Sequence, residues 1–184
     1  MISYDIVMTG FAGWNGSRSI YMDERYKRKL LEIYPPSFLA PLEAEMTAGD
    51  EDFMKAFLEA EEQGLSIRAG EGGVYAALWK LLHQNRFSAS FSQRAIPIRQ
   101  ETVEICETFS LDPYRLDSDG CFIWLSRGET GKLISMAEGI WGKGSAAIIG
   151  SAEKGTAIRR VDSEETAYLR RPEPDEILKL EPGI

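Results

Sequence analysis

The sequence contains little of the chemistry from which most catalytic and metal sites are built. It has one histidine, His83, and two cysteines, Cys106 and Cys121. A single histidine near the end of a predicted helix has no second histidine for a zinc site and no nearby partner for a nucleophile relay. The cysteines lack metal-ligand spacing, so we expect reduced core thiols. There is no lysine-bearing phosphate loop, and no acidic pair is marked by its spacing as an acid–base couple.

Long apolar runs and an excess of basic residues are also missing. No apolar stretch approaches the roughly 20 residues of a membrane helix, and no basic-then-apolar leader precedes Tyr4. The formal net charge is −8, from 21 basic and 29 acidic side chains. This balance argues against a nucleic-acid or membrane partner but leaves room for a local basic patch. We therefore predict a cytoplasmic protein that binds neither nucleic acid nor membrane.

The length and the apolar content indicate one domain with a substantial core. The chain has 184 residues, of which 43% are hydrophobic. We expect a single domain over residues 1–172 and an acidic, proline-containing tail over residues 173–184. A strand predicted at residues 5–9 begins almost at the first residue. Because a strand needs a neighbour, this start favours a piece of a longer protein.

The most informative stretch begins at residue 66. It is predicted to form a short strand, then a glycine-rich turn, and then a helix. Gly70, Gly72 and Gly73 leave little side chain there, so a ligand or another backbone can approach. The first amides of the helix, pointing outward at the positive end of its dipole, would bind phosphate or carboxylate. The alternative is a packing turn in which glycine lets helix and strand touch. The buried face of this helix is predicted to contain Val74, Ala77, Leu78, Leu81 and Leu82.

A second glycine-rich turn, around Gly13 and Gly16, joins the first strand to a helix predicted over residues 17–33. Ser17 or Asn15 is the expected N-cap of this helix. Gly13, Gly16 and Ser17 could hold an anion at the helix start, and a simple strand-to-helix turn is again the alternative.

The remaining pattern predicts an α/β (α+β) fold, a layered sandwich in which helices cover a mixed sheet. Helices alternate with strands, but the chain ends in a run of strands, which suits a mixed sheet better than a purely parallel one. In the helix expected over residues 50–63, the inward side chains should be Phe53, Phe57 and Leu58. Further helices are predicted at residues 99–109 and 128–140, and further strands at residues 87–92, 121–125 and 145–151. Residues 157–161 and 166–169 are predicted to form a hairpin around Ser163 and Glu164.

Five segments, in order, resemble the C-terminal domain of proteins related to aminoimidazole ribonucleotide synthetase. Residues 67–79 resemble the His-Asp-x-x-Glu-Gly-Gly-Val-x-x-Ala-Leu-Trp turn and helix of that family, and residues 5–10 resemble the strand that opens the domain. Residues 34–39 match a recurrent spacer, and residues 96–101 and 111–120 resemble the signature of the hydrogenase-maturation, carbamoyl dehydratase-like branch. Together these segments span almost the whole chain.

The resemblance implies half of an ATP-dependent enzyme. The family includes selenophosphate synthetase, thiamine-monophosphate kinase and a purine-pathway amidotransferase. In its members an N-terminal half holds most of the ATP and magnesium site and builds the dimer core, while the C-terminal half closes over the nucleotide. The resemblance therefore implies ATP and Mg for a full-length enzyme and no cofactor for this chain alone. It also implies a partner, which would be the N-terminal ATP-binding half or a second copy in a homo-dimer, and a small anionic substrate.

Two departures from the family pattern affect the predicted site. Arg68 stands where the family turn usually has an aspartate, so it would either bind an anion or pair with Glu71. The chain ends at Ile184, without the terminal cysteine of the hydrogenase-maturation dehydratase.

Two functions remain open at this point. In the first, the chain is the C-terminal domain of such an enzyme, inactive alone. In the second, it is a non-catalytic anion- or protein-binding module derived from that domain. No catalytic residue is identified. The substrate- or phosphate-binding residues expected in either case are Gly13, Gly16, Ser17, Arg68, Gly70, Glu71, Gly72, Gly73 and Arg99.

Overall fold

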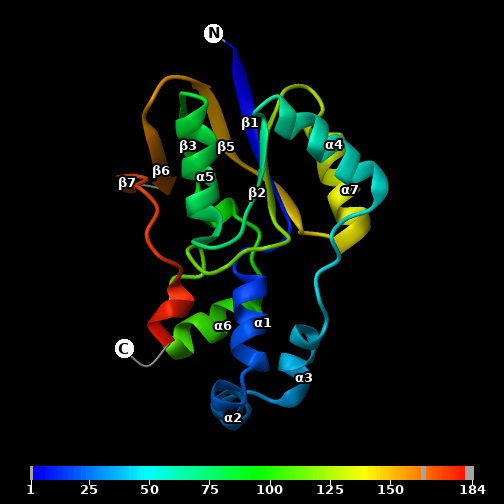
Figure 1. Ribbon diagram of the computed structural model, residues 1–184, viewed down its shortest axis with the longest axis vertical. Helices are drawn as coiled ribbons and strands as arrows, with labels where there is room; N and C mark the ends of the chain where they lie inside the picture. Colours follow the sequence, from blue (N-terminus) through cyan, green and yellow to red (C-terminus); the bar gives the residue numbers. More distant parts are fainter. Residues whose placement is uncertain (1, 163–164, 181–184) are drawn as a thin grey trace.

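The computed structural model describes residues 2–162 and 165–180, and its centre is one mixed β-sheet (Figure 1). The strands of this sheet are β1 (Ser3–Thr9), β2 (Ser66–Arg68), β3 (Phe87–Phe91), β4 (Phe122–Ser126), β5 (Ala146–Lys154), β6 (Ile158–Asp162) and β7 (Glu165–Tyr168). Their spatial order is β2-β4-β1-β5-β3-β6-β7. The β3–β6 pair is parallel and the other pairs are antiparallel. The predicted layered α/β fold with a mixed sheet is confirmed.

Helices cover both faces of the sheet and form a separate layer at one end of it. The helices are α1 (Trp14–Met22), α2 (Glu24–Ile33), α3 (Pro36–Leu39), α4 (Glu51–Glu62), α5 (Gly73–Gln84), α6 (Gln100–Phe109) and α7 (Thr130–Trp141), with short 3-10 turns η1 (Ala40–Glu43), η2 (Gln93–Ala95) and η3 (Glu176–Leu180). In Figure 1, α5 lies on one face of the sheet and α4 with α7 on the other. Below the sheet, α1, α2, α3 and α6 form a helical lobe. No helix in the described part of the chain is long and apolar enough to cross a membrane.

The central strands are apolar on both faces because both faces are covered. In β1, Ile6 and Met8 pack under α5, while Val7 between them packs toward α4 and α7. In β4 the same alternation puts Ile123 on the α5 side and Trp124 on the opposite side. This two-residue period explains why both segments read as continuous apolar runs in the sequence.

The predicted buried face of the helix that follows Gly70, Gly72 and Gly73 is confirmed. Val74, Ala77, Leu78, Leu81 and Leu82 are all buried in α5. Their spacing of three and four residues places them on one side of the helix, against the sheet.

Two helix predictions were wrong. The helix expected over residues 17–33 is two helices, because Asp23 has extended backbone angles and its side chain accepts a hydrogen bond from the Arg25 amide to cap α2. The first helix also begins earlier than expected. Its N-cap is Gly13 in the left-handed region at φ 67°, not Ser17 or Asn15.

The burial of α4 also differs from the sequence prediction at one position. Phe53 and Phe57 are buried against the sheet, as predicted, but Leu58 is 52% exposed. In a helix, Leu58 is rotated about 100° from Phe57, which takes it off the apolar stripe.

The hairpin predicted near the C-terminal end of the chain is confirmed. Strands β6 and β7 form the expected antiparallel hairpin, and its connection at Ser163 and Glu164 lies outside the described residues. The tail contains the 3-10 turn η3, which is anchored where the Tyr26 hydroxyl donates to the Leu180 carbonyl at 2.5 Å. The domain boundary near residue 172 stays a prediction.

Gly150→Ala is predicted to destabilise the sheet, because a methyl group there would lie 2.6 Å from the Phe91 Cα of the neighbouring strand β3. Overpacking of this kind costs about 1–3 kcal/mol. The free energy of unfolding in urea measures it. Gly131→Ala in α7 is the control, since nothing lies near its added methyl group and alanine favours a helix by about 0.5–1 kcal/mol. Equal stability for the two variants would contradict the packing argument.

Candidate functional site

Both glycine-rich turns pack against one segment, the loop of residues 112–120 that connects α6 to β4. The turn before α1 is called here the first corner, and the turn before α5 the second corner. In the sequence they are almost 60 residues apart, from Gly13 to Gly72. In the fold they meet across this loop, so most of the predicted site residues belong to one region of the molecule.

The first corner gives its amides to the loop. The Gly13 amide donates to the Ser118 hydroxyl at 2.9 Å, and the Gly16 amide donates to the Asp117 carbonyl at 2.9 Å. The Asn15 side-chain amide donates to the Asp117 carboxylate at 2.7 Å. Gly13, Gly16 and Ser118 are buried. The loop therefore occupies the positions where an anion would meet these two backbone amides.

The second corner bonds to the same loop from the other side. The Ser118 amide donates to the Gly70 carbonyl at 3.2 Å, and the Tyr75 amide donates to the Tyr114 carbonyl at 3.2 Å. Gly73, at φ 67°, donates to the Gly70 carbonyl at 3.0 Å within its own turn. The backbone approaches closely here, which is the role that glycine has at a packing turn.

A carboxylate from the C-terminal segment occupies the start of α5. The Gly72 amide donates to Asp175 Oδ2 at 2.8 Å, and the other oxygen of Asp175 accepts from the Ile177 amide at 2.9 Å. Asp175 is 8% exposed. The positive end of α5 thus carries a negative group, as its dipole favours, but the group belongs to the protein itself.

The expectation of outward-pointing corner amides is therefore wrong for Gly13, Gly16, Gly72 and Gly73. Each of these amides donates to a protein acceptor. The packing-turn alternative describes them. Ser17 is also buried, one turn into α1, and its hydroxyl has no hydrogen-bond partner within the described residues.

Arg68 is the cation at the opening of the second corner. Its Nε lies 2.7 Å from Asp119 Oδ1, and both side chains are about half exposed, at 48% and 47%. Glu71 is exposed, and the alternative in which Arg68 pairs with Glu71 is wrong, because the guanidinium pairs with Asp119, three residues before the start of β4. Gly70 has open space around its Cα. An anion could reach this opening through side chains rather than through backbone amides.

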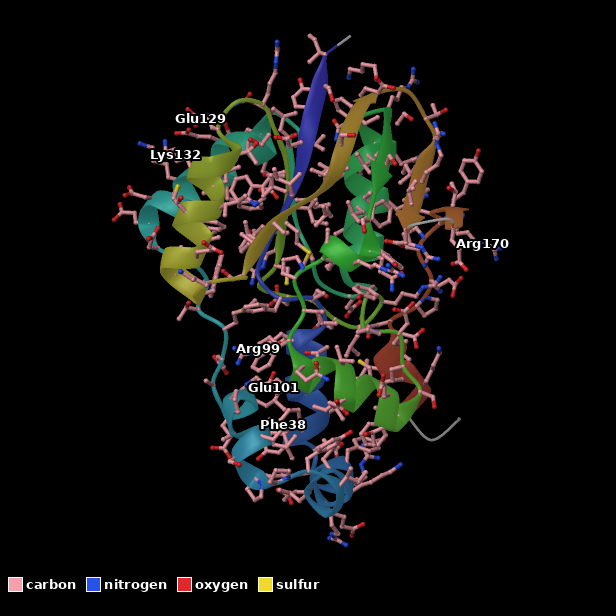
Figure 2. The ribbon with its side chains drawn as sticks, turned by 180° about the vertical axis from the view of Figure 1, so that it is seen from behind. Phe38, Arg99, Glu101, Glu129, Lys132 and Arg170 are labelled. Carbon is pink, nitrogen blue, oxygen red and sulfur yellow. The ribbon has the colours of Figure 1, made fainter. Side chains whose placement is uncertain are left out.

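Arg99 lies beside the first corner, at the junction of the sheet and the helical lobe (Figure 2). Its guanidinium carbon is 4.8 Å from the Trp14 ring centre and 5.5 Å from that of Phe11. Its Nη2 lies 3.3 Å from a carboxylate oxygen of Glu101, which is 8% exposed. Stacking on two rings restrains the guanidinium while leaving some of its N–H donors available.

A small cleft opens beside this arginine, and we call it the Arg99 cleft. It has a volume of about 180 Å³ and is lined mainly by Phe11, Trp14, Met46, Arg99 and Trp141. Glu45 also lines it. Aromatic walls with one cation suit a small planar or anionic group.

The reactive side chains are not poised for nucleophilic chemistry. Burial raises the pKa of the Cys106 thiol to about 12 and raises the pKa of Cys121 as well, so both remain neutral thiols in the core. His83 stacks on Trp79 at 4.3 Å near the end of α5. Within the described residues no group of three or more His, Cys, Asp or Glu side chains could hold a metal ion.

Sequence reasoning missed the 112–120 loop as the common partner of both corners, and it missed Asp175. In the sequence, residues 111–120 stand out only by their resemblance to the hydrogenase-maturation signature. A serine flanked by two aspartates was the available signal, because Ser and Asp side chains readily bond to nearby backbone amides.

Three comparisons with known proteins were informative only at the level of structure. No family model matches the sequence, and no curated protein matches it. Among solved structures, hydrogenase maturation protein HypE in complex with ATP is similar with a TM-score of 0.66 at 16% identity. HypE from E. coli is similar with a TM-score of 0.66 at 15% identity. Thiamine-monophosphate kinase from Stenotrophomonas maltophilia is similar with a TM-score of 0.57 at 14% identity.

The shared fold confirms the predicted resemblance to these proteins at the level of the fold. The match to HypE with ATP covers 95% of this chain and 52% of that chain. The match to the thiamine-monophosphate kinase covers 89% and 51%. The chain thus spans about half the length of the structures it resembles.

Asp175→Asn is predicted to lower the free energy of unfolding by about 1–2 kcal/mol, because one charge-assisted hydrogen bond at the start of α5 is lost. The side chain of asparagine has an NH2 group in place of one carboxylate oxygen. This group would face one of the two backbone amides that now donate to Asp175. Urea denaturation measures the change. Glu62→Gln, an exposed change near the end of α4, is the control and should be close to neutral. An unaffected Asp175→Asn variant would mean that the carboxylate does not stabilise the corner.

Asp112→Asn is predicted to become more stable relative to the parent protein as pH rises. Burial raises the pKa of Asp112, and the Tyr114 amide and Arg115 only partly offset this. A raised carboxyl pKa means that the folded state holds the proton longer than the unfolded state, so the contribution of Asp112 to stability falls as pH rises through the raised pKa. Urea denaturation between about pH 3.5 and about pH 7 measures the difference.

Asp23→Asn is the control of opposite sign. The hydrogen bond from Arg25 lowers the pKa of Asp23, so its contribution to stability is present above its ordinary pKa and is lost as pH falls. The Asp23 variant should therefore lose stability relative to the parent as pH rises. The same trend with pH for both variants would contradict the assigned direction at one of the two sites.

Proposed function

We propose that this chain is the C-terminal, substrate-side domain of an ATP-dependent enzyme related to aminoimidazole ribonucleotide synthetase. The observation that carries the proposal is the extent of the structural match. The fold of HypE accounts for 95% of this chain, while the chain accounts for 52% of HypE. A domain that matches half of a two-part enzyme from end to end is expected to do the work of one half.

The nucleotide and its magnesium would be held by the other half. A similar HypE structure contains ATP. The corner amides of this chain that could cradle phosphates donate to protein acceptors instead. Its described residues also provide no cluster of three metal-binding side chains. On this proposal the chain alone does not turn over ATP, and its role is to shape and close the substrate cleft.

The substrate would be a small anion that meets side chains at the two corners. Arg68 beside the second corner and Arg99 beside the first are the proposed contacts, with Gly70 and Glu71 at the open rim. Gly13, Gly16, Gly72 and Gly73 would act by allowing close packing, and Ser17 would support the first corner from within. Arginine suits this role because its planar fork matches carboxylate and phosphate oxygens.

The proposed partner is the ATP-binding half or a second copy of the chain. One similar HypE structure is a complex with HypF, at 15% identity to this chain. Several large apolar side chains are exposed on the helical lobe, including Met22, Leu31 and Ile33. A partner that covered them would remove apolar surface from water.

A second candidate function is a non-catalytic module that binds a small anion or a protein. The observation that favours it is chemical. Arg68 stands where the family turn has a carboxylate, and it is paired with Asp119. Asp175 fills the start of α5. Both features close positions that an active enzyme of this kind would use.

Arg68→Ala and Arg99→Ala are predicted to weaken the binding of small phosphorylated or carboxylated metabolites by about tenfold each, equivalent to about 1.4 kcal/mol. A thermal-shift screen followed by calorimetry measures the affinities. Arg28→Ala, an exposed change on α2, is the control and should bind as the parent does. Equal weakening by all three variants would indicate general electrostatics and contradict the site.

ATP hydrolysis by the purified chain with magnesium separates the two parts of the proposal. We expect no turnover above background, because the nucleotide-holding half is absent. Robust turnover would overturn the assignment. Recovery of ATP-dependent activity on addition of an ATP-binding half would favour the enzyme domain over the non-catalytic module.

A further inference from the structure

A cavity lined by three arginines lies at the β7 end of the sheet, and we call it the arginine pocket. Its volume is about 200 Å³, and it is lined by Tyr75, Arg115, Arg160, Ala167, Tyr168, Leu169 and Arg170. The arginines come from the 112–120 loop, from β6 and from the segment after β7. In Figure 2, Arg170 lies beside β7, on the opposite side of the molecule from Glu129 and Lys132. No carboxylate is among the lining residues.

The Arg160 side chain is oriented by Gln93 and Asp162, which are not among the residues that line the pocket. Gln93 Oε1 accepts from Arg160 Nη1 at 2.8 Å and from the Tyr75 hydroxyl at 2.7 Å. Asp162 Oδ2 lies 3.4 Å from Arg160 Nε. Asp162 is itself fixed by the Ser92 hydroxyl at 2.7 Å. A guanidinium oriented by such a network loses less entropy when it binds an anion.

Arg115 is held in a similar way, but Arg170 is not. Arg115 Nε lies 3.4 Å from Asp112 Oδ2, and its Nη1 pairs with Glu173. Arg170 is exposed, and it makes no ion pair with any residue in the ranges 2–162 and 165–180. Each guanidinium carries five N–H donors, more than these contacts use.

Ordinary surface salt bridges explain only part of this arrangement. Such pairs contribute about 0–1 kcal/mol and need no shared cavity. They account for Arg115 and Arg160 separately. They do not account for the convergence of three cations on one cavity, with the third lacking a partner carboxylate among the described residues. Like charges that converge in this way are relieved by a bound anion.

Tyr75 keeps the inner wall of the pocket neutral. It is 8% exposed, and its ring stacks on Tyr114 with centres 5.6 Å apart. Burial raises the pKa of Tyr75 to about 12, so its hydroxyl remains protonated at physiological pH. The wall therefore adds an aromatic surface and no negative charge.

The size of the pocket limits what it can hold. Sites for drug-sized ligands usually have about 300–1,000 Å³, which is more than the arginine pocket provides. A whole nucleotide would not be enclosed. A phosphate group fits both the volume and the planar forks of arginine, which bind phosphate oxygens in pairs.

We propose that the arginine pocket binds the phosphate group of a small ligand, either inorganic phosphate or a small phosphate ester. Arg115, Arg160 and Arg170 bind the phosphate oxygens, and Tyr168 at the mouth contacts whatever the phosphate carries. This site is separate from the Arg99 cleft and from the opening at Arg68, with which it shares no lining residue. It therefore does not depend on the function proposed above.

Isothermal titration of the full chain with inorganic phosphate, at constant ionic strength, tests the proposal. We expect saturable one-to-one binding that Arg170→Gln and Arg160→Gln each weaken by about tenfold, equivalent to about 1.4 kcal/mol. Arg160→Lys should weaken binding too, because lysine keeps the charge but loses the planar fork. Arg28→Gln, an exposed change on α2, should bind as the parent does.

Several outcomes are informative. Arg170 has no partner to lose within the described residues, so the Arg170→Gln variant should fold normally, and its loss of affinity would not reflect misfolding. Tighter binding of glycerol phosphate than of phosphate would indicate an ester ligand, and equal binding would indicate free phosphate. Absence of saturable binding would overturn the proposal. So would binding that survives Arg170→Gln and Arg160→Gln but is lost in Arg68→Ala or Arg99→Ala.

Discussion

The structure depends on Ser118, which links the two strand-to-helix corners. Its hydroxyl accepts from the Gly13 amide at 2.9 Å and donates to the Leu116 carbonyl at 2.9 Å, while its own amide donates to the Gly70 carbonyl at 3.2 Å. Ser118 is fully buried, so water cannot replace these bonds. A buried donor left without an acceptor costs about 1–3 kcal/mol. Ser118 therefore connects the two corners directly, because its side chain bonds to the first corner and its backbone amide bonds to the second.

This link changes what the glycines do. Glycine at a strand-to-helix turn is compatible with two designs, a cradle whose amides face a ligand or a joint whose backbone touches another backbone. At Gly73 an added methyl group would lie 2.8 Å from the Leu116 carbonyl oxygen, which leaves no room for a ligand. Both corners are joints. On the proposed function, anions would therefore be bound by the arginine side chains around the corners and not by the backbone amides.

The sequence was sufficient to predict the local elements and the layered sheet, because those follow from short-range patterns. The face of α5 around Val74 and Leu78 has a clear helical period, and residues 87–92 alternate as a half-buried strand. The break at Asp23 was not predictable from hydrophobicity, since apolar residues continue on both sides of it.

The parts of the site that could not be predicted are contacts between residues far apart in the chain. Asp175 accepts a hydrogen bond from the Gly72 amide, 103 residues away in the sequence. Ser118 accepts one from the Gly13 amide, 105 residues away. No local pattern encodes which acceptor reaches a given amide. Arg68 illustrates the same limit, because a nearby Glu71 was available and Asp119, 51 residues away, is the partner.

The charge of the molecule shows why composition alone is a poor guide to binding. A net charge of −8 describes the average surface, yet a phosphate responds to potential within about 8 Å at physiological ionic strength. Asp112, Asp162 and Glu173 lie behind the arginines rather than among the residues that line the pocket. Placed there, the acidic side chains orient the cations and leave the lining of the pocket without a carboxylate. An acidic protein can therefore present a cationic pocket, because the position of a carboxylate decides whether it competes with a ligand or supports the group that binds it.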